Sequence, residues 1–122
     1  MVRFSLFITV VVAAASLLAT AAGAATHPRL IGVVGKDDAY RISLTSGGAL
    51  VKSLAAGTYT LVIHDDSAIH NYVLAGPHGQ SRTFTSVPFA GTKTITLKLT
   101  AGTYKAFCAP HEPIMFQQFT VR

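Results

Sequence analysis

The sequence predicts an all-β protein: a single-domain antiparallel Greek-key β-sandwich of seven or eight strands. Three observations lead to this fold class. From Leu30 onward, apolar and polar residues alternate with a period of two. No stretch of this part has a convincing helical period. Turn-forming residues interrupt the alternation at short intervals, and several short strands spaced in this way are typical of a sandwich.

Most of the expected strands are short runs in which apolar side chains recur at every second position, while residues 70–74 form a run without this alternation. The runs are residues 40–45, 58–64, 70–74, 94–100, 104–108 and 119–121. In the first of them, Tyr40, Ile42 and Leu44 alternate with polar residues. Because successive side chains of a strand point to opposite faces of the sheet, this pattern indicates half-buried strands.

Clusters of Gly, Pro, Asp and Ser separate the runs and predict the turns between them. They occupy residues 35–38, 46–48, 56–57, 76–79, 88–91 and 101–102. The tetrapeptide Ala-Gly-Thr-Tyr opens a strand twice, at 56–59 and at 101–104. No linker divides residues 25–122, so we expect one domain over this range.

The first 24 residues have the pattern of a signal peptide. Arg3 gives a positive start, residues 6–18 are apolar, and Ala22-Gly23-Ala24 is a small-residue cleavage signal. An uncleaved membrane anchor is the alternative, since about 17–25 apolar residues span a bilayer. The sequence favours cleavage, which predicts an exported protein, periplasmic or extracellular, without stable membrane insertion.

Charge and cysteine content exclude several classes of protein. Only 12% of the 122 residues are charged, which excludes a disordered polyelectrolyte. Without Arg3, nine Lys and Arg face five Asp and Glu, a net charge of +4. These cations are dispersed, which argues against nucleic-acid binding. The lone Cys108 excludes an internal disulfide framework, and we expect a monomer.

The C-terminal part contains a group of possible metal ligands. Cys108 ends an alternating run, His111 follows three residues later, and Met115 lies four residues beyond. The prolines around His111 predict a tight loop that can turn a thiol, an imidazole and a thioether toward one centre. Two histidines, one cysteine and a weak axial methionine form a blue-copper electron-transfer site, so a second histidine is required.

Three histidines could complete this set: His64, His70 and His78. His64 is on the polar side of its run, and His78 lies in a Gly-Pro-His-Gly turn that is expected to be solvated. His70 begins a new run and has the amide of Asn71 beside it. This position suits a ligand that other side chains hold in place, and we therefore choose His70.

At these residues the sequence resembles the cupredoxin family, specifically the small bacterial plastocyanin-like blue copper proteins. Beyond the paired Ala-Gly-Thr-Tyr turns, the matching pieces are Asp65-x-Ser67-x-Ile69-His70-Asn71-Tyr72, Leu74-x-Gly76-Pro77, Cys108-x-Pro110-His111 and Phe119-Thr120-Val121. The resemblance extends from Leu30 to Arg122. It implies a cupredoxin-like sandwich in which His70, Cys108 and His111 bind one copper ion with Met115 as axial ligand.

The resemblance also implies that Asn71 ties the two ligand loops together by hydrogen bonds. The sequence departs from the usual pattern at Ala109, where Asp is common, and at Gln117, where Gly is common. Glycine would allow a positive φ or a close backbone approach, so Gln117 bears on how Met115 is placed.

The loop around His111 is the expected contact surface for redox protein partners. Its small apolar patch would consist of Pro77, Pro110, Pro113, Ile114 and Phe116. The positive charge favours an acidic partner. The predicted function is therefore transfer of single electrons between redox partners, without enzymatic activity.

Three alternatives remain open. A copper carrier or storage module would use the same ligands, and zinc accepts the same nitrogen and sulfur donors, although methionine is a poor zinc ligand. A cysteine hydrolase could combine Cys108 with His70 or His111 and Asn71. The strand pattern offers no helix to lower the pKa of its thiol, which makes it the least favoured.

Overall fold

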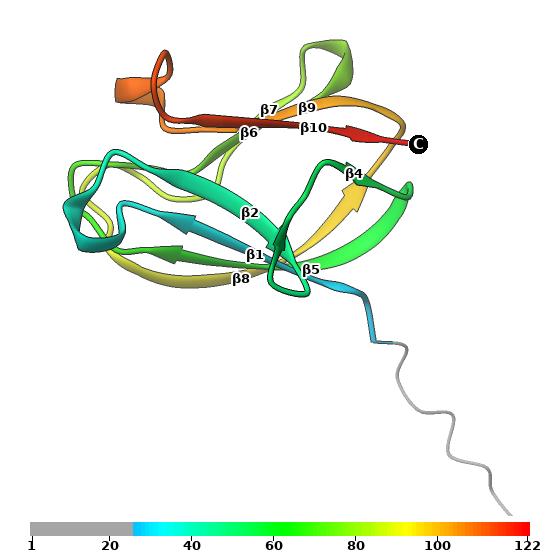
Figure 1. The fold of residues 1–122 in the computed structure, drawn as a ribbon, viewed down its shortest axis with the longest axis horizontal. Helices are drawn as coiled ribbons and strands as arrows, with labels where there is room; N and C mark the ends of the chain where they lie inside the picture. The colour runs from blue at the N-terminus through cyan, green and yellow to red at the C-terminus, as the bar shows by residue number, and fades with distance from the viewer. Residues whose placement is uncertain (1–25) are drawn as a thin grey trace, which may run out of the picture.

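The computed structural model describes residues 26–122, which fold into ten strands in two layers (Figure 1). The strands are β1 (Arg29–Val34), β2 (Ile42–Ser46), β3 (Ala49–Leu50), β4 (Ser53–Leu54), β5 (Gly57–Asp65), β6 (Val73–Ala75), β7 (Ser81–Thr83), β8 (Gly91–Leu99), β9 (Gly102–Phe107) and β10 (Phe116–Val121). Three 3-10 turns, η1 (Lys36–Asp38), η2 (Pro77–Gly79) and η3 (Ala109–His111), connect them. The expected signal peptide, residues 1–24, lies outside the described residues.

Each layer is a sheet of five strands. One has the order β3-β2-β1-β5-β8 and the other β4-β10-β9-β6-β7. Most neighbours are antiparallel, but β1 pairs with β5 and β10 pairs with β4 in parallel. The expected all-β sandwich is therefore confirmed, with mixed sheets in place of purely antiparallel ones. Within residues 26–122, no helix is long and apolar enough to cross a membrane.

The core lies between the two sheets, as the alternation predicts. Tyr59, Leu61 and Ile63 of β5 are buried, as are Tyr104 and Ala106 of β9. Removing one such large side chain from water contributes about 1.5–3 kcal/mol. Packing of the apolar strand faces therefore holds the two sheets together. It also determines where the loops at the strand ends are placed.

Tyr40 is exposed, although the predicted alternation places it on the buried face of a strand. It lies in the connection between η1 and β2 and is 51% exposed. Tyr40 continues the period of two of Ile42 and Leu44 in the sequence, but it precedes the first residue of β2. The chain bends at this residue, so its side chain does not belong to the core face of β2.

The connections that carry the predicted ligands gather at one end of the sandwich. In Figure 1 this is the left-hand end, where the loop from β9 to β10 in the upper layer faces the loop from β1 to β2 in the lower layer. The C-terminus and the described start of the chain lie at the other end. The fold therefore separates the candidate site from both ends of the described chain.

Candidate metal centre

The loop from Cys108 to Met115 is closed by its own backbone. The Cys108 N–H donates to the carbonyl of Met115 (3.1 Å), where β9 and β10 separate. The N–H of His111 donates to the carbonyl of Cys108 (3.1 Å), and that of Met115 to the carbonyl of His111 (2.9 Å). Pro110 suits the first turn of η3, since it has no N–H to leave unpaired. These bonds hold three possible ligands in a fixed relation.

His70 reaches the same place from the connection between β5 and β6, which passes from one sheet to the other. The N–H of Asp66 donates to the carbonyl of Val34 (2.9 Å), which fixes the start of the connection to β1. At its end the Tyr72 N–H donates to Thr85 Oγ1 (2.8 Å), and the Tyr72 hydroxyl donates to the carbonyl of Ser43 (3.1 Å). The segment is thus anchored on both sides of His70.

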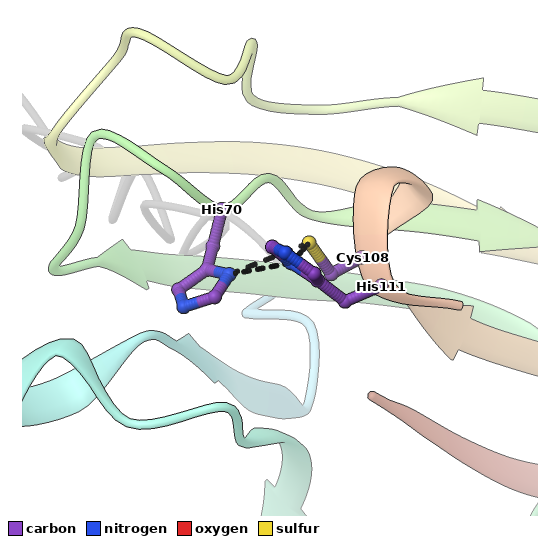
Figure 2. Close-up of side chains that lie close together, drawn as sticks. All are labelled: His70, Cys108 and His111. Carbon is purple, nitrogen blue, oxygen red and sulfur yellow. Dashed lines mark hydrogen bonds between the residues drawn. The ribbon is translucent and has the colours of Figure 1, made fainter. Parts of the chain in front are cut away.

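Three donor atoms from these two segments converge. Nδ1 of His70 lies 3.1 Å from Nδ1 of His111, and the two nitrogens lie 3.7 and 3.6 Å from Cys108 Sγ. Figure 2 shows both imidazoles turned toward the thiol. His70 and Cys108 are fully buried, whereas His111 is partly exposed. Among residues 26–122, these three side chains form a group that could hold a metal ion.

These separations fit one metal ion. An ion about 2.0 Å from each imidazole nitrogen and about 2.3 Å from a thiolate sulfur allows a nitrogen and the sulfur to lie up to about 4.3 Å apart. All three observed separations are shorter than this limit. Two imidazoles and a thiolate, with a buried thioether on the same loop, form the donor set of copper rather than of a hard cation.

Met115 is buried at the end of this loop, 1% exposed. Two residues further on, the Gln117 side chain binds the opposite sheet: Nε2 donates to the carbonyls of Leu44 (3.0 Å) and Val51 (2.9 Å), and Oε1 accepts from the Leu44 N–H (2.8 Å). This glutamine therefore connects β10 to β2, directly after the segment that carries Met115.

Asn71 joins the two ligand segments. Its backbone N–H donates to Cys108 Sγ (3.4 Å), and its Oδ1 accepts from the N–H of Ala109 (2.8 Å). The side chain is buried, so both bonds are protected from water. The thiolate is the form of cysteine that binds a metal, and the Asn71 N–H points at this sulfur. These bonds match the role that the family resemblance implied for Asn71.

The other histidines considered from the sequence do not reach the site. His64 Nδ1 lies 3.1 Å from Thr92 Oγ1 on β8. His78 is exposed in η2 with a φ of 61°. Of the three histidines considered, His70 is thus the one that lies beside Cys108 and His111.

The expected place of Pro77 is wrong. A side-chain carbon at Gly102 would lie 2.7 Å from Pro77 Cβ, so Pro77 packs at the first residue of β9. Cys108 follows the last residue of that strand, and at about 3.3 Å per residue the two ends are about 15–20 Å apart. Pro77 therefore lies far from His111, at the opposite end of β9 from Cys108. Pro110, Pro113 and Ile114 are exposed beside His111 in the chain.

Two features near the site were not predicted. Tyr40 contacts both histidine rings, with ring centroids 4.9 Å from His70 and 4.7 Å from His111. Gly35 approaches His70 so closely that an added Cβ would lie 2.9 Å from its Cδ2. The turn at residues 35–38 was visible in the sequence, but nothing in it indicated which residues the turn would face.

Asp65, the last residue of β5, has a buried carboxyl group. Its Oδ1 accepts from the Ser67 N–H (3.3 Å), while Oδ2 is buried without a hydrogen-bond partner in residues 26–122. Burial raises the pKa of Asp65, and the hydrogen bond from the Ser67 N–H offsets part of the effect. Burial likewise raises the pKa of Tyr72.

On the surface, Lys105 Nζ and Glu112 Oε1 form an ion pair at 3.1 Å.

Comparison with known proteins gives matches of structure only. No protein-family model matches the sequence, and no curated protein does so. Reduced rusticyanin superposes with a TM-score of 0.57 at 18% identity, covering 77% of this chain and 78% of that one. Rusticyanin from Thiobacillus ferrooxidans gives 0.53 at 18% identity, covering 77% and 76%. Auracyanin A, a "blue" copper protein from Chloroflexus aurantiacus, gives 0.50 at 20% identity, covering 77% and 98%. The chain therefore has the fold of these proteins, the cupredoxin fold.

Proposed function

We propose that this chain is an exported blue copper protein that binds one copper ion and passes single electrons between redox protein partners. His70, Cys108 and His111 would bind the ion, with Met115 as axial ligand. The observation that carries the proposal is the convergence of two imidazole nitrogens and one sulfur within 3.7 Å of one another. The shared fold with rusticyanin and auracyanin A supports it.

When bound, copper supplies a one-electron couple between Cu(I) and Cu(II). The contribution of the chain is a ligand set that is held in place. The backbone bonds within residues 108–115 fix Cys108, His111 and Met115 relative to one another. Asn71 ties that loop to the segment carrying His70. A rigid set suits both oxidation states, so little has to move when an electron arrives or leaves.

Burial of Cys108 favours this function over a cysteine hydrolase. Its side chain is 0% exposed, and its sulfur lies between two imidazoles. A nucleophile must meet its substrate, and a thiol enclosed in this way cannot attack an external carbonyl. The arrangement therefore supports metal binding rather than covalent catalysis.

The contact surface for partners is proposed around His111, the partly exposed ligand. Pro110, Pro113 and Ile114 surround it in sequence, and Ile114 is 68% exposed. Phe116 is also exposed, whereas Pro77 takes no part. The charge of +4 over residues 25–122 favours an acidic partner. A monomer with a small contact surface suits a brief redox encounter.

The proposed domain boundaries follow from the sequence. Residues 1–24 would act as a signal peptide and residues 25–122 as the copper domain. Cleavage after Ala24 would release the domain to the periplasm or the cell exterior. The mass of the protein recovered from the periplasm or medium tests this boundary.

Visible absorption of the Cu(II)-loaded protein tests the function. Residues 25–122 should give an intense blue band that disappears on reduction and returns on oxidation. Cys108→Ser should abolish the band, because a hydroxyl is a hard donor that stays protonated and cannot replace a thiolate. An unchanged band in Cys108→Ser contradicts the ligand assignment. A colourless protein that holds only Cu(I) would instead indicate copper carriage.

A further inference from the structure

The ring of His70 lacks the usual second anchor of a metal ligand. A ligating histidine normally donates its other ring N–H to a carboxylate or carbonyl, which fixes the orientation of the ring. Nε2 of His70 is buried and has no hydrogen-bond partner among residues 26–122. The plane of this ring must therefore be set by the side chains and backbone that pack against it.

The connection between β1 and β2, residues 35–41, supplies those contacts. Gly35 lies against Cδ2 of His70, so closely that no side chain fits between them. Tyr40 meets the same ring nearly at a right angle, with an interplanar angle of 78°. Tyr40 also meets the His111 ring at 74°, and the two histidine rings meet each other at 71°. Three rings thus form a mutually perpendicular group, an arrangement that aromatic pairs prefer.

The backbone holds Tyr40 in this position. The Arg41 N–H donates to the carbonyl of Ala39 (2.8 Å), which closes a three-residue turn centred on Tyr40. The Gly35 N–H donates to the carbonyl of Arg41 (3.0 Å), which closes the whole connection. A side chain that is half exposed would ordinarily sample several rotamers, but this one has a fixed base and two ring contacts.

We propose that Tyr40 is a positioning residue of the metal centre. Its ring fixes the planes of the His70 and His111 imidazoles and covers them on the solvent side. In doing so it replaces the hydrogen bond that His70 Nε2 lacks. We assign this role to the ring, which makes both contacts, and not to the hydroxyl, so Tyr40→Phe should preserve it. The proposal concerns the site of the proposed function and rests on its ligand assignment.

The first experiment needs no copper. NMR spectra of the metal-free protein report the ring protons of His70 and His111, whose shifts depend on the ring current of Tyr40. The wild type and Tyr40→Phe should give single, well-dispersed signals for both rings. Tyr40→Ala and Tyr40→Leu should shift these signals toward the values of a free histidine. Tyr40→Leu keeps apolar bulk, so full recovery by leucine would show that the ring is not needed and would overturn the proposal.

The second experiment measures copper retention. In the Cu(II)-loaded protein, Tyr40→Ala should release copper to a competing chelator about tenfold faster, the effect expected from losing two aromatic contacts. Azide should alter the visible spectrum of Tyr40→Ala and leave those of the wild type and Tyr40→Phe unchanged. Leu50→Ala is the control, because Leu50 is exposed and lines the same surface hollow as Tyr40 without taking part in the ring group.

The outcomes separate the two proposals. If Tyr40→Ala has the same histidine signals and the same rate of copper release as the wild type, the proposed role of Tyr40 is wrong. An equal effect of Leu50→Ala would do the same, since the hollow rather than the ring would then be responsible. A wild-type protein that takes up no copper rejects the proposed function instead, and the NMR spectra of the metal-free variants still decide whether Tyr40 orients the two rings. If Tyr40→Ala does not fold, the NMR spectra of Tyr40→Leu test whether Tyr40 orients the two rings.

Discussion

Gln117 connects the two sheets beside the candidate site through hydrogen bonds that are all made to backbone groups. Its amide contacts the N–H and carbonyl of Leu44 and the carbonyl of Val51. Leu44 lies in β2 and Val51 follows β3, whereas Gln117 belongs to β10. A single side chain therefore bonds three main-chain groups of the opposite layer, of which the Leu44 carbonyl also accepts from the Val51 N–H (3.0 Å). The glycine common at this position in the family could not do so.

Gln117→Ala should lower the free energy of unfolding by about 2 kcal/mol, because it leaves buried or half-buried backbone groups without partners. Urea unfolding of the metal-free protein measures this change. Gln118→Ala is a matched control on the same strand, since Gln118 is exposed and should cost under about 0.5 kcal/mol. Equal losses in the two variants would show that the hydrogen bonds of Gln117 contribute nothing to stability.

Asp65 carries a destabilising charge at neutral pH, because burial raises the pKa of its carboxyl above the ordinary value. A carboxyl with a higher pKa in the folded chain binds more protons when folded than when unfolded. Stability therefore falls as the pH rises from the unfolded pKa, near 3.9, through the folded one, and then stays level.

Asp65→Asn should remove this fall, and the variant should gain thermal stability over the wild type above about pH 4. Melting temperatures of the metal-free proteins between acidic and neutral pH measure the gain. Asp66→Asn changes the net charge equally at an exposed neighbour and should stabilise less. A melting temperature that Asp65→Asn lowers at every pH would mean that hydrogen bonding to the carboxylate outweighs its desolvation.

At the scale of elements, strands were predictable and the faces of loops were not. A strand repeats its environment every second residue, so alternation in β5 and β9 identified both the strands and their buried faces. The connection of residues 35–41 has no period. Its contacts with His70 depend on how two sheets are stacked, which local sequence does not encode. The same reason explains why Tyr40 was assigned to a strand.

The β1–β2 connection also depends on a glycine. Gly35 has a φ of +69°, and an added Cβ would lie 2.5 Å from Ser67 Cβ as well as 2.9 Å from His70. Gly35→Ala should therefore destabilise the protein by about 1–3 kcal/mol beyond the cost of the backbone conformation, the range for an overpacked interior. The variant should also displace the His70 ring.

Gly47→Ala provides the control for this prediction. Gly47 has a similar φ of +57° but no atom within 4 Å of an added Cβ. It should therefore show the cost of the backbone conformation alone, about 1 kcal/mol. Thermal or urea unfolding of the two variants gives the difference. If Gly35→Ala is no less stable than Gly47→Ala, the connection yields to a side chain and does not constrain His70.

At the scale of the whole molecule, the sequence located the site because three of its residues are close in the chain. Cys108, His111 and Met115 fall within one loop, so their spacing alone indicated a common centre. His70 lies far away in the sequence, in the connection between β5 and β6, and it was chosen because it begins a new run with Asn71 beside it, a choice that the family resemblance supported. Pro77 was misplaced for the converse reason: β6 runs antiparallel to β9, which carries the residue after β6 away from Cys108.

This arrangement gives the molecule one end with the candidate site and another with the described chain ends (Figure 1). His111 is the partly exposed member of the donor group, and Ile114 stands beside it in the loop. Electrons are therefore expected to pass through this end. A charge placed there should obstruct apolar contact with a partner, whereas the same charge at the other end should act only through the overall field.

Ile114→Lys should consequently slow electron transfer to a redox partner while the blue absorption remains. Thr103→Lys is the matched control: Thr103 is exposed near the start of β9, far from His111, and the substitution changes the net charge equally. Stopped-flow rates with an acidic partner measure both variants. Because the chain is positive, these rates should also fall with added salt, as screening shortens to about 8 Å at physiological ionic strength. If Ile114→Lys and Thr103→Lys change the rates alike, the long-range charge governs the encounter and the His111 end is not where partners make contact.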